Sequence, residues 1–118
     1  EDLEAKVRVF GSNTGDSIFV TMNNPLKITK QDSEHGGRYI TTLEGHEAVI
    51  TYSKIGGDVI VADYTGVPAA IGGRGVALAL TKSMIEDARA SGFKVVPACS
   101  YTAAQFRRHP EWADVLAA

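Results

Sequence analysis

The segment spanning residues 67–77 limits most strongly what this chain can fold into. Residues 58–67 are rich in β-branched side chains and predict a strand, which Pro68 ends because proline lacks a backbone N–H. A loop with three glycines follows, and residues 75–91 then show helical periodicity. The apolar positions of that helix recur every three or four residues: Ala77, Leu80, Met84 and Ala88. The chain therefore has to accommodate a strand, a tight loop and a long helix in direct succession.

An antiparallel meander of three strands is expected before this loop. Residues 38–43, 47–52 and 58–67 have the composition and alternation of strands, and turn-forming residues separate them at 44–45 and 56–58. One face of the second strand is apolar and is expected to be buried: Ala48, Ile50 and Tyr52.

The C-terminal part completes the predicted fold. Gly92 suits the left-handed position after the helix, and residues 93–99 predict a fourth strand that returns beside the third by a helical crossover. Residues 102–108 predict a short helix and residues 110–116 a last turn. The element order β-β-β-α-β-α predicts an α+β fold, in which an antiparallel meander is followed by a β-α-β crossover and a short C-terminal helix.

The N-terminal residues have two interpretations. Polar and apolar residues alternate in segments 6–10 and 17–22, and a cluster of turn formers separates the two segments. This pattern favours an extra β-hairpin. The other interpretation is a leader with weak structure, since the chain opens without methionine and Met22 would serve as a natural start. We therefore divide the chain into an N-terminal extension or hairpin at 1–27 and one domain at 28–118.

Composition excludes several classes of protein. The chain has 118 residues, 44% of them hydrophobic and 22% charged, which suits a single packed core. Its net charge of -2 provides no basic field for nucleic acid. One cysteine, Cys99, rules out an intrachain disulfide and a thiolate metal cluster, and the three histidines lack helical ligand spacing. No apolar run is long enough to span a membrane and no secretory signal is visible, so we expect a cytoplasmic protein.

The glycine loop predicts an anion site at the start of the helix. The first turn of a helix has N–H groups without partners, and glycines let the backbone approach a phosphate closely. A P-loop is excluded because Gly75-Val76-Ala77 supplies neither lysine nor hydroxyl, and a dinucleotide fingerprint needs a third glycine where Leu78 stands. The alternative is a tight turn that merely requires glycine.

The loop also resembles the coenzyme-binding motif of the GNAT superfamily of N-acetyltransferases, Gln/Arg-x-x-Gly-x-Gly/Ala. Gly73-Arg74-Gly75 matches its second half, whereas Ala70 stands at the Gln/Arg position. Further segments match in order and spacing: Val67-Pro68, Ala88-Arg89, Val96-Pro97-Ala98-Cys99-Ser100-Tyr101 and Arg108-His109-Pro110-Glu111. From about Ile28 onward the chain is similar to compact GNAT-like proteins of about 100 residues. This resemblance implies a three-layer-like α/β/α core that binds acetyl-CoA.

The resemblance also implies roles for individual residues at the coenzyme. The backbone of Thr65 to Val67 would pair with the pantetheine arm, as a peptide adds to a sheet edge. The main-chain N–H groups of the loop and first helical turn would hold the pyrophosphate: Gly73, Arg74, Gly75, Val76 and Ala77. The Arg74 guanidinium would add a charge-assisted contact to a coenzyme phosphate, as would Arg107 or Arg108. No metal site is expected.

Catalysis of acetyl transfer to an amine requires a base, a polarised carbonyl oxygen and a proton for the leaving thiolate. Many relatives read His-Thr-Glu-Val-Pro where this chain reads Tyr64-Thr65-Gly66-Val67-Pro68, so Glu47 or His46 is the candidate base. Cys99 would form an acetyl-cysteine or guard the site, and Tyr101 would donate the proton or line the pantetheine tunnel.

The resulting prediction is an N-acetyltransferase that forms a direct ternary complex with acetyl-CoA and a primary amine. The amine would belong to a small molecule, a lysine or an N-terminus. Two alternatives remain, namely a non-catalytic coenzyme A-binding module and an interaction domain that binds no coenzyme. We expect no nucleic-acid or membrane partner, and a monomer or weak dimer.

Overall fold

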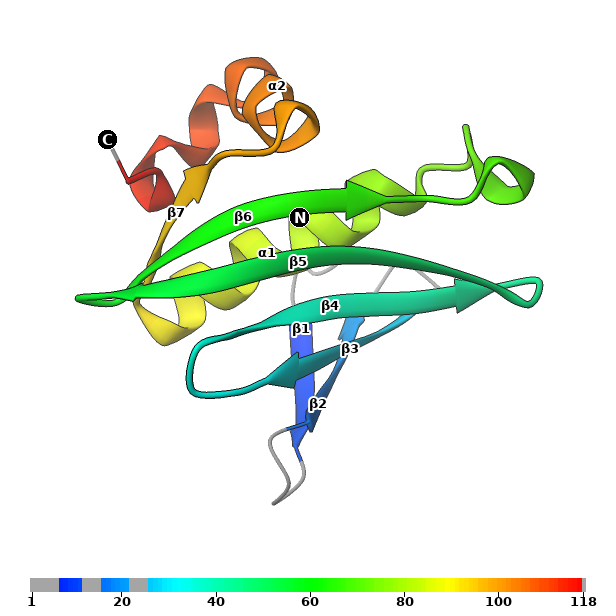
Figure 1. The fold of residues 1–118 in the computed structure, drawn as a ribbon, viewed down its shortest axis with the longest axis horizontal. Helices are drawn as coiled ribbons and strands as arrows, with labels where there is room; N and C mark the ends of the chain where they lie inside the picture. Colours follow the sequence, from blue (N-terminus) through cyan, green and yellow to red (C-terminus); the bar gives the residue numbers. More distant parts are fainter. Residues whose placement is uncertain (1–6, 12–15, 22–25, 118) are drawn as a thin grey trace.

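The computed structural model describes residues 7–11, 16–21 and 26–117, with the side chains of residues 26–117. The described residues form a seven-stranded sheet in which each strand lies beside the next one in sequence, with α1 across one face (Figure 1). The strands are β1 (Val7–Gly11), β2 (Asp16–Thr21), β3 (Lys27–Asp32), β4 (Gly36–Leu43), β5 (His46–Gly56), β6 (Val59–Gly66) and β7 (Lys94–Pro97). The helices are α1 (Val76–Ser91) and α2 (Ser100–Arg108), with 3-10 turns η2 (Ala69–Ile71) and η3 (Pro110–Val115).

The predicted α+β fold is confirmed. Strands β4, β5 and β6 form the antiparallel meander, α1 follows as the crossover, and β7 pairs parallel to β6. The apolar face predicted for the second meander strand is buried, because Ala48, Ile50 and Tyr52 are each less than 5% exposed.

Strand β3 is not predicted by the sequence analysis, and its presence is a correction. Its side chains alternate poorly, since Ile28 is its one buried residue, Lys27 is exposed, and the others are polar and partly exposed. Backbone pairing with β2 on one side and β4 on the other holds the strand in the sheet. Such a strand leaves little signal in hydrophobic periodicity.

Strands β1 and β2 pair antiparallel where the alternation indicated a hairpin, and β2 continues the sheet from β3. The residues between these strands, 12–15, lie outside the described part of the chain, as do residues 1–6 and Met22. The division of the chain at residue 27 therefore stays a prediction.

Helix α1 packs against β4 and β5 and contributes the largest share of the core. Leu80, Met84 and Ala88 are buried as predicted, but Ala77 is only half-buried because it lies in the first turn beside the loop. Gly92 ends the helix with φ of 83°, and its N–H donates to the Ala88 carbonyl oxygen. No helix within the described ranges is both long and apolar enough to cross a membrane.

The C-terminal elements close the edge of the sheet beyond β7 (Figure 1). The Phe106 and Trp112 rings pack edge to face, with centroids 5.9 Å apart, and join α2 to η3. The Arg89 guanidinium donates two hydrogen bonds to the Asp114 carboxylate and so ties η3 to α1. Helix α2 begins at Ser100, two residues before the predicted start.

Candidate active site

Strands β6 and β7 separate at the end of β6 that leads into the glycine loop. Their parallel pairing ends with Ala62 opposite Pro97. The N–H groups of Ala98 and Cys99 then both donate to the Ala62 carbonyl oxygen, at 3.2 and 3.0 Å, and the chain turns into α2. Strand β6 continues to Gly66, paired only with β5 among the described strands. Its other edge therefore offers backbone groups to an extended ligand.

A β-bulge lies at the point where the two strands separate. Thr51 pairs with Tyr64 and Tyr52 with Ala62, so Asp63 is the extra residue on β6. The Ser53 hydroxyl donates to the Asp63 carboxylate at 2.6 Å and fixes the bulged residue. A bulge bends its strand, so the register shift directs the last residues of β6 away from β7.

The glycine loop joins this open strand end to α1. A short 3-10 turn, η2, comes first, and Gly73 and Gly75 then take φ angles of 74° and 79°. An added Cβ at either glycine would meet no atom within 4 Å, so glycine is required here for backbone conformation and not for space. The first turn of α1 contains no acidic side chain and no side-chain cap. Its N–H groups, with the positive end of the helix dipole, suit an anion.

Arg74, predicted to contact a phosphate, forms an ion pair with Glu44 at 3.0 Å. Glu44 belongs to the turn between β4 and β5, where it has φ of 52°. Both side chains are about half-exposed, at 45% and 60%, so the pair contributes little to stability. The guanidinium thus lies at the glycine loop with an exchangeable partner.

Cys99 and Thr65 face each other across the opening between β6 and β7. Cys99 is the half-buried N-cap residue of α2, and its thiol lies 3.5 Å from Thr65 Oγ1. Burial acts to raise the pKa of this thiol. Burial is outweighed by nearby groups that favour the thiolate: the Thr65 hydroxyl, the N–H groups of Thr102 and Tyr101, and the Thr102 hydroxyl. The pKa therefore lies below the usual cysteine value.

The first turn of α2, which follows Cys99, contains Tyr101 and Thr102. Thr102 Oγ1 is fully buried without a hydrogen-bond partner among the described residues, so its O–H is free to turn toward a Cys99 thiolate. Burial raises the pKa of the Tyr101 phenol, while Arg108 and a hydrogen bond with Thr81 act to lower it. The phenol therefore keeps its proton at neutral pH. Sequence reasoning did not find Thr102, because a threonine in a helix carries no separate signal.

Glu47 and His46 are exposed and lie at the start of β5. Thr65 pairs with Ile50 and shares its face of the sheet, whereas Glu47 falls on the opposite face by alternation along β5. The structure thus brings Cys99 and Thr65 together, places the Tyr101 phenol beside Thr81 of α1, and leaves Glu47 on the other side of the sheet. The bulged Asp63, which the sequence analysis did not single out, lies nearer the strand opening on β6.

Comparison with known proteins gives a family match that contains this site. A protein-family model described as GCN5-related N-acetyl-transferase matches residues 38–115 of the 118-residue chain. No curated protein matches the chain. The matched residues include the meander, the strand opening, the glycine loop and Cys99. Since the family match covers more than half of its length, the chain belongs to the GCN5-related N-acetyltransferase family.

Proposed function

We propose that the protein is an acetyl-CoA-dependent N-acetyltransferase that acts through a direct ternary complex with a primary amine. The observation that carries this proposal is the continuous path from the opening between β6 and β7 to the glycine loop. A strand edge with free backbone groups leads to a helix N-terminus that suits a pyrophosphate. The family to which the chain belongs generally uses this coenzyme.

The residues along this path have the hydrogen-bonding and charged groups that the amides and phosphates of acetyl-CoA require. The backbone of Thr65 to Val67 would hydrogen-bond the amides of the pantetheine arm. The N–H groups of Gly73 to Ala77 would surround the pyrophosphate, and the Arg74 guanidinium would exchange the Glu44 carboxylate for a phosphate. Bound acetyl-CoA supplies the acetyl group in activated form, as a thioester.

Acetyl transfer requires a proton for the leaving thiolate and a base for the amine, and side chains near the strand opening would supply both. The Tyr101 phenol keeps its proton at neutral pH because burial raises its pKa, and it would donate that proton to the leaving thiolate. The Cys99 thiol borders the same space beside Thr65. In a direct transfer it would line the acetyl site. Glu47 lies on the opposite face of the sheet from Thr65, so it would act as the base, through water, only for an amine that approaches the opening from that face.

A second candidate function is a coenzyme-binding module without turnover. It is favoured by Tyr64 and Gly66, which stand where many relatives carry histidine and glutamate. Incubation with acetyl-CoA and a panel of small amines and lysine peptides, with chromatography of the coenzyme A released, separates the two functions. Release that depends on an amine supports the transferase. Saturable acetyl-CoA binding without release for any amine would favour the module.

A further inference from the structure

Thr102 carries a buried hydroxyl group without a partner. The side chain lies in the first turn of α2 and is fully buried, and its Oγ1 has no hydrogen-bond partner among the described residues. Leaving a buried hydroxyl unpaired is costly, so such an atom in a folded protein calls for an explanation. An acceptor that forms or arrives beside it during function provides one.

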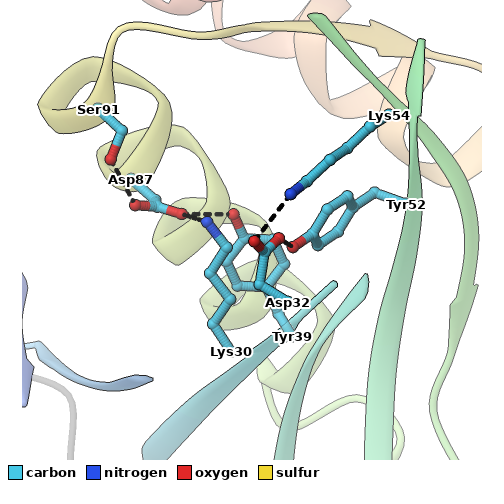
Figure 2. Close-up of polar contacts among 7 residues, drawn as sticks. All are labelled: Lys30, Asp32, Tyr39, Tyr52, Lys54, Asp87 and Ser91. Carbon is cyan, nitrogen blue, oxygen red and sulfur yellow. Dashed lines mark hydrogen bonds and ion pairs between the residues drawn. The ribbon is translucent and has the colours of Figure 1, made fainter. Parts of the chain in front are cut away.

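Polar side chains at the other end of the sheet are instead paired with one another (Figure 2). Two carboxylates there each accept hydrogen bonds from one tyrosine hydroxyl and one lysine ammonium. The two sets are Asp87 with Tyr39 and Lys30, and Asp32 with Tyr52 and Lys54. Such pairing is the usual state of buried polar groups. Thr102 is one of two exceptions among the described residues, the other being Ser83 of α1.

The acceptor within reach of the Thr102 hydroxyl is the sulfur of Cys99. Burial acts to raise the pKa of this thiol, but the Thr65 hydroxyl, nearby N–H groups and the Thr102 hydroxyl outweigh it and hold the pKa below its usual value. The thiolate is the form of cysteine that reacts as a nucleophile. The surroundings of Cys99 therefore favour a reactive sulfur and supply a hydroxyl that has no other use.

This sulfur lies beside the free edge of β6. It is 3.5 Å from Thr65 Oγ1, and Thr65 comes after Ala62, where the pairing of β6 with β7 ends. An extended ligand that pairs with the free edge passes Cys99. A coenzyme with its phosphates at the glycine loop and its pantetheine arm on this edge brings its own terminal sulfur into the same opening.

We propose that Cys99 is a site of reversible covalent modification by coenzyme A disulfide, which leaves one coenzyme A attached to the chain as a mixed disulfide. This proposal rests on the proposed function, because the same loop and strand edge deliver the disulfide to Cys99. The attached arm occupies the place of acetyl-CoA, so acetyl transfer stops until a thiol reductant releases it.

The reaction is a thiol–disulfide exchange without net oxidation. The Cys99 thiol gives its proton to water, and the thiolate attacks one sulfur of coenzyme A disulfide. The new S–S bond to Cys99 forms as the original S–S bond breaks. The second coenzyme A leaves as a thiolate and takes a proton from water. The Thr102 hydroxyl stabilises the attacking thiolate before the bond forms.

The test follows adduct formation on the reduced protein by intact-protein mass spectrometry, with coenzyme A disulfide and glutathione disulfide at equal concentrations. Coenzyme A disulfide should react with saturation and at least about tenfold faster, because binding at the loop holds the two sulfurs together. The adduct should have the mass of the chain plus one coenzyme A less two hydrogen atoms, and dithiothreitol should remove it. Cys99→Ser should form no adduct.

Two variants separate the chemistry from the delivery of the disulfide. Thr102→Val keeps the shape of the side chain without the hydroxyl, and it should slow the reaction with both disulfides about three- to tenfold. Arg74→Gln should slow the reaction with coenzyme A disulfide alone, because it removes a charge from the glycine loop. Arg38→Gln is the matched control, at an exposed arginine on β4, and should react at the parent rate.

Equal rates with the two disulfides would overturn the proposal, as would an unchanged rate with both in Thr102→Val. Thermal unfolding of the same samples with acetyl-CoA distinguishes this failure from failure of the proposed function. If acetyl-CoA raises Tm but the two disulfides react equally fast, the coenzyme site stands and the modification site is lost. If acetyl-CoA does not raise Tm and the rates are equal, both proposals are lost.

Discussion

The Cys99 thiol and the Thr65 hydroxyl lie 3.5 Å apart across the opening between β6 and β7. This contact joins the last strand of the meander, β6, to the N-cap residue of α2, just beyond the point where parallel pairing stops. Because helix N–H groups and a hydroxyl surround the sulfur, the site stabilises negative charge there. The same preference would serve a thiolate or an oxyanion formed beside Cys99 during acetyl transfer.

Cys99 should react as a low-pKa thiol. Its hydrogen-bond donors favour the thiolate and outweigh burial, so the rate of iodoacetamide alkylation should rise at lower pH in the folded protein than in the urea-unfolded chain. Thr65→Val removes one donor and should move the reactive pKa back toward the unfolded value. A reactive pKa equal to or above that of the unfolded chain would contradict this account of the site.

Tyr101→Phe should lower kcat about 100-fold if the phenol donates the proton to the leaving thiolate. Acetyl-CoA binding should stay within about twofold of the parent, since the loop that holds the phosphates is untouched. Tyr64→Phe is the control, because it makes the same change at a tyrosine that is 57% exposed on β6. Equal losses of kcat in both variants would argue against a specific role for Tyr101.

The Arg74–Glu44 ion pair should compete with the coenzyme phosphates for the guanidinium. Arg74→Gln is expected to weaken acetyl-CoA binding about three- to tenfold, and Glu44→Gln to strengthen it about twofold. Calorimetric titration of both variants checks the prediction. Arg38→Gln, at an exposed arginine that donates to Gln31, is the charge-matched control and should bind normally. Weaker binding in Glu44→Gln would contradict the proposed exchange.

Asp32 should make stability depend on pH in the acid range. Burial acts to raise its pKa, but hydrogen bonds from Lys54 and Tyr52 and the nearby Lys30 charge outweigh burial, and the pKa lies below the ordinary value of 3.8. A depressed pKa stabilises the fold above the unfolded-state pKa, and this contribution is lost as pH falls through the folded value. Urea unfolding between about pH 6 and pH 3 should therefore show a shallower loss of stability in Asp32→Asn. An identical pH dependence of stability in the parent chain and in Asp32→Asn would contradict this role of Asp32.

The buried Asp87 carboxylate should depend strongly on its tyrosine. It is 5% exposed and accepts from Tyr39, whose side chain is fully buried. Tyr39→Phe should lower the free energy of unfolding by about 1.5–3 kcal/mol, since a hydrogen bond to a buried charge is lost. Tyr52→Phe should cost less, because its partner Asp32 is about one third exposed. Urea unfolding of both variants measures the difference.

Much of the fold was predictable because the alternation in β5 and the helical period in α1 are strong. Ala48 and Ile50 on one element, and Leu80 and Met84 on the other, are buried as their spacing indicates. Strand β3 was missed because it buries only Ile28, and backbone pairing to two neighbours leaves no mark on composition.

The site was less predictable, because strand register decides which residues meet. The glycine loop was visible, since Gly73 and Gly75 stand where positive φ is needed. The bulge at Asp63, which turns β6 from β7, follows from pairing with β5 and not from local sequence. The same register leaves Glu47 on the face opposite Thr65, and no pattern within β5 alone reveals this.

The measurement that tests the central claim most directly is thermal unfolding with and without acetyl-CoA, for the parent chain, Gly75→Glu and Gly57→Glu. Both glycines have positive φ and open space around the Cβ position, so both variants carry similar backbone strain. At a hundredfold excess over Kd, acetyl-CoA should stabilise the parent by about 2.7 kcal/mol, a rise in Tm of about 10 °C. This rise should persist in Gly57→Glu and disappear in Gly75→Glu while that variant stays folded. No rise in the parent, or an equal rise in Gly75→Glu, would contradict a coenzyme site at the glycine loop.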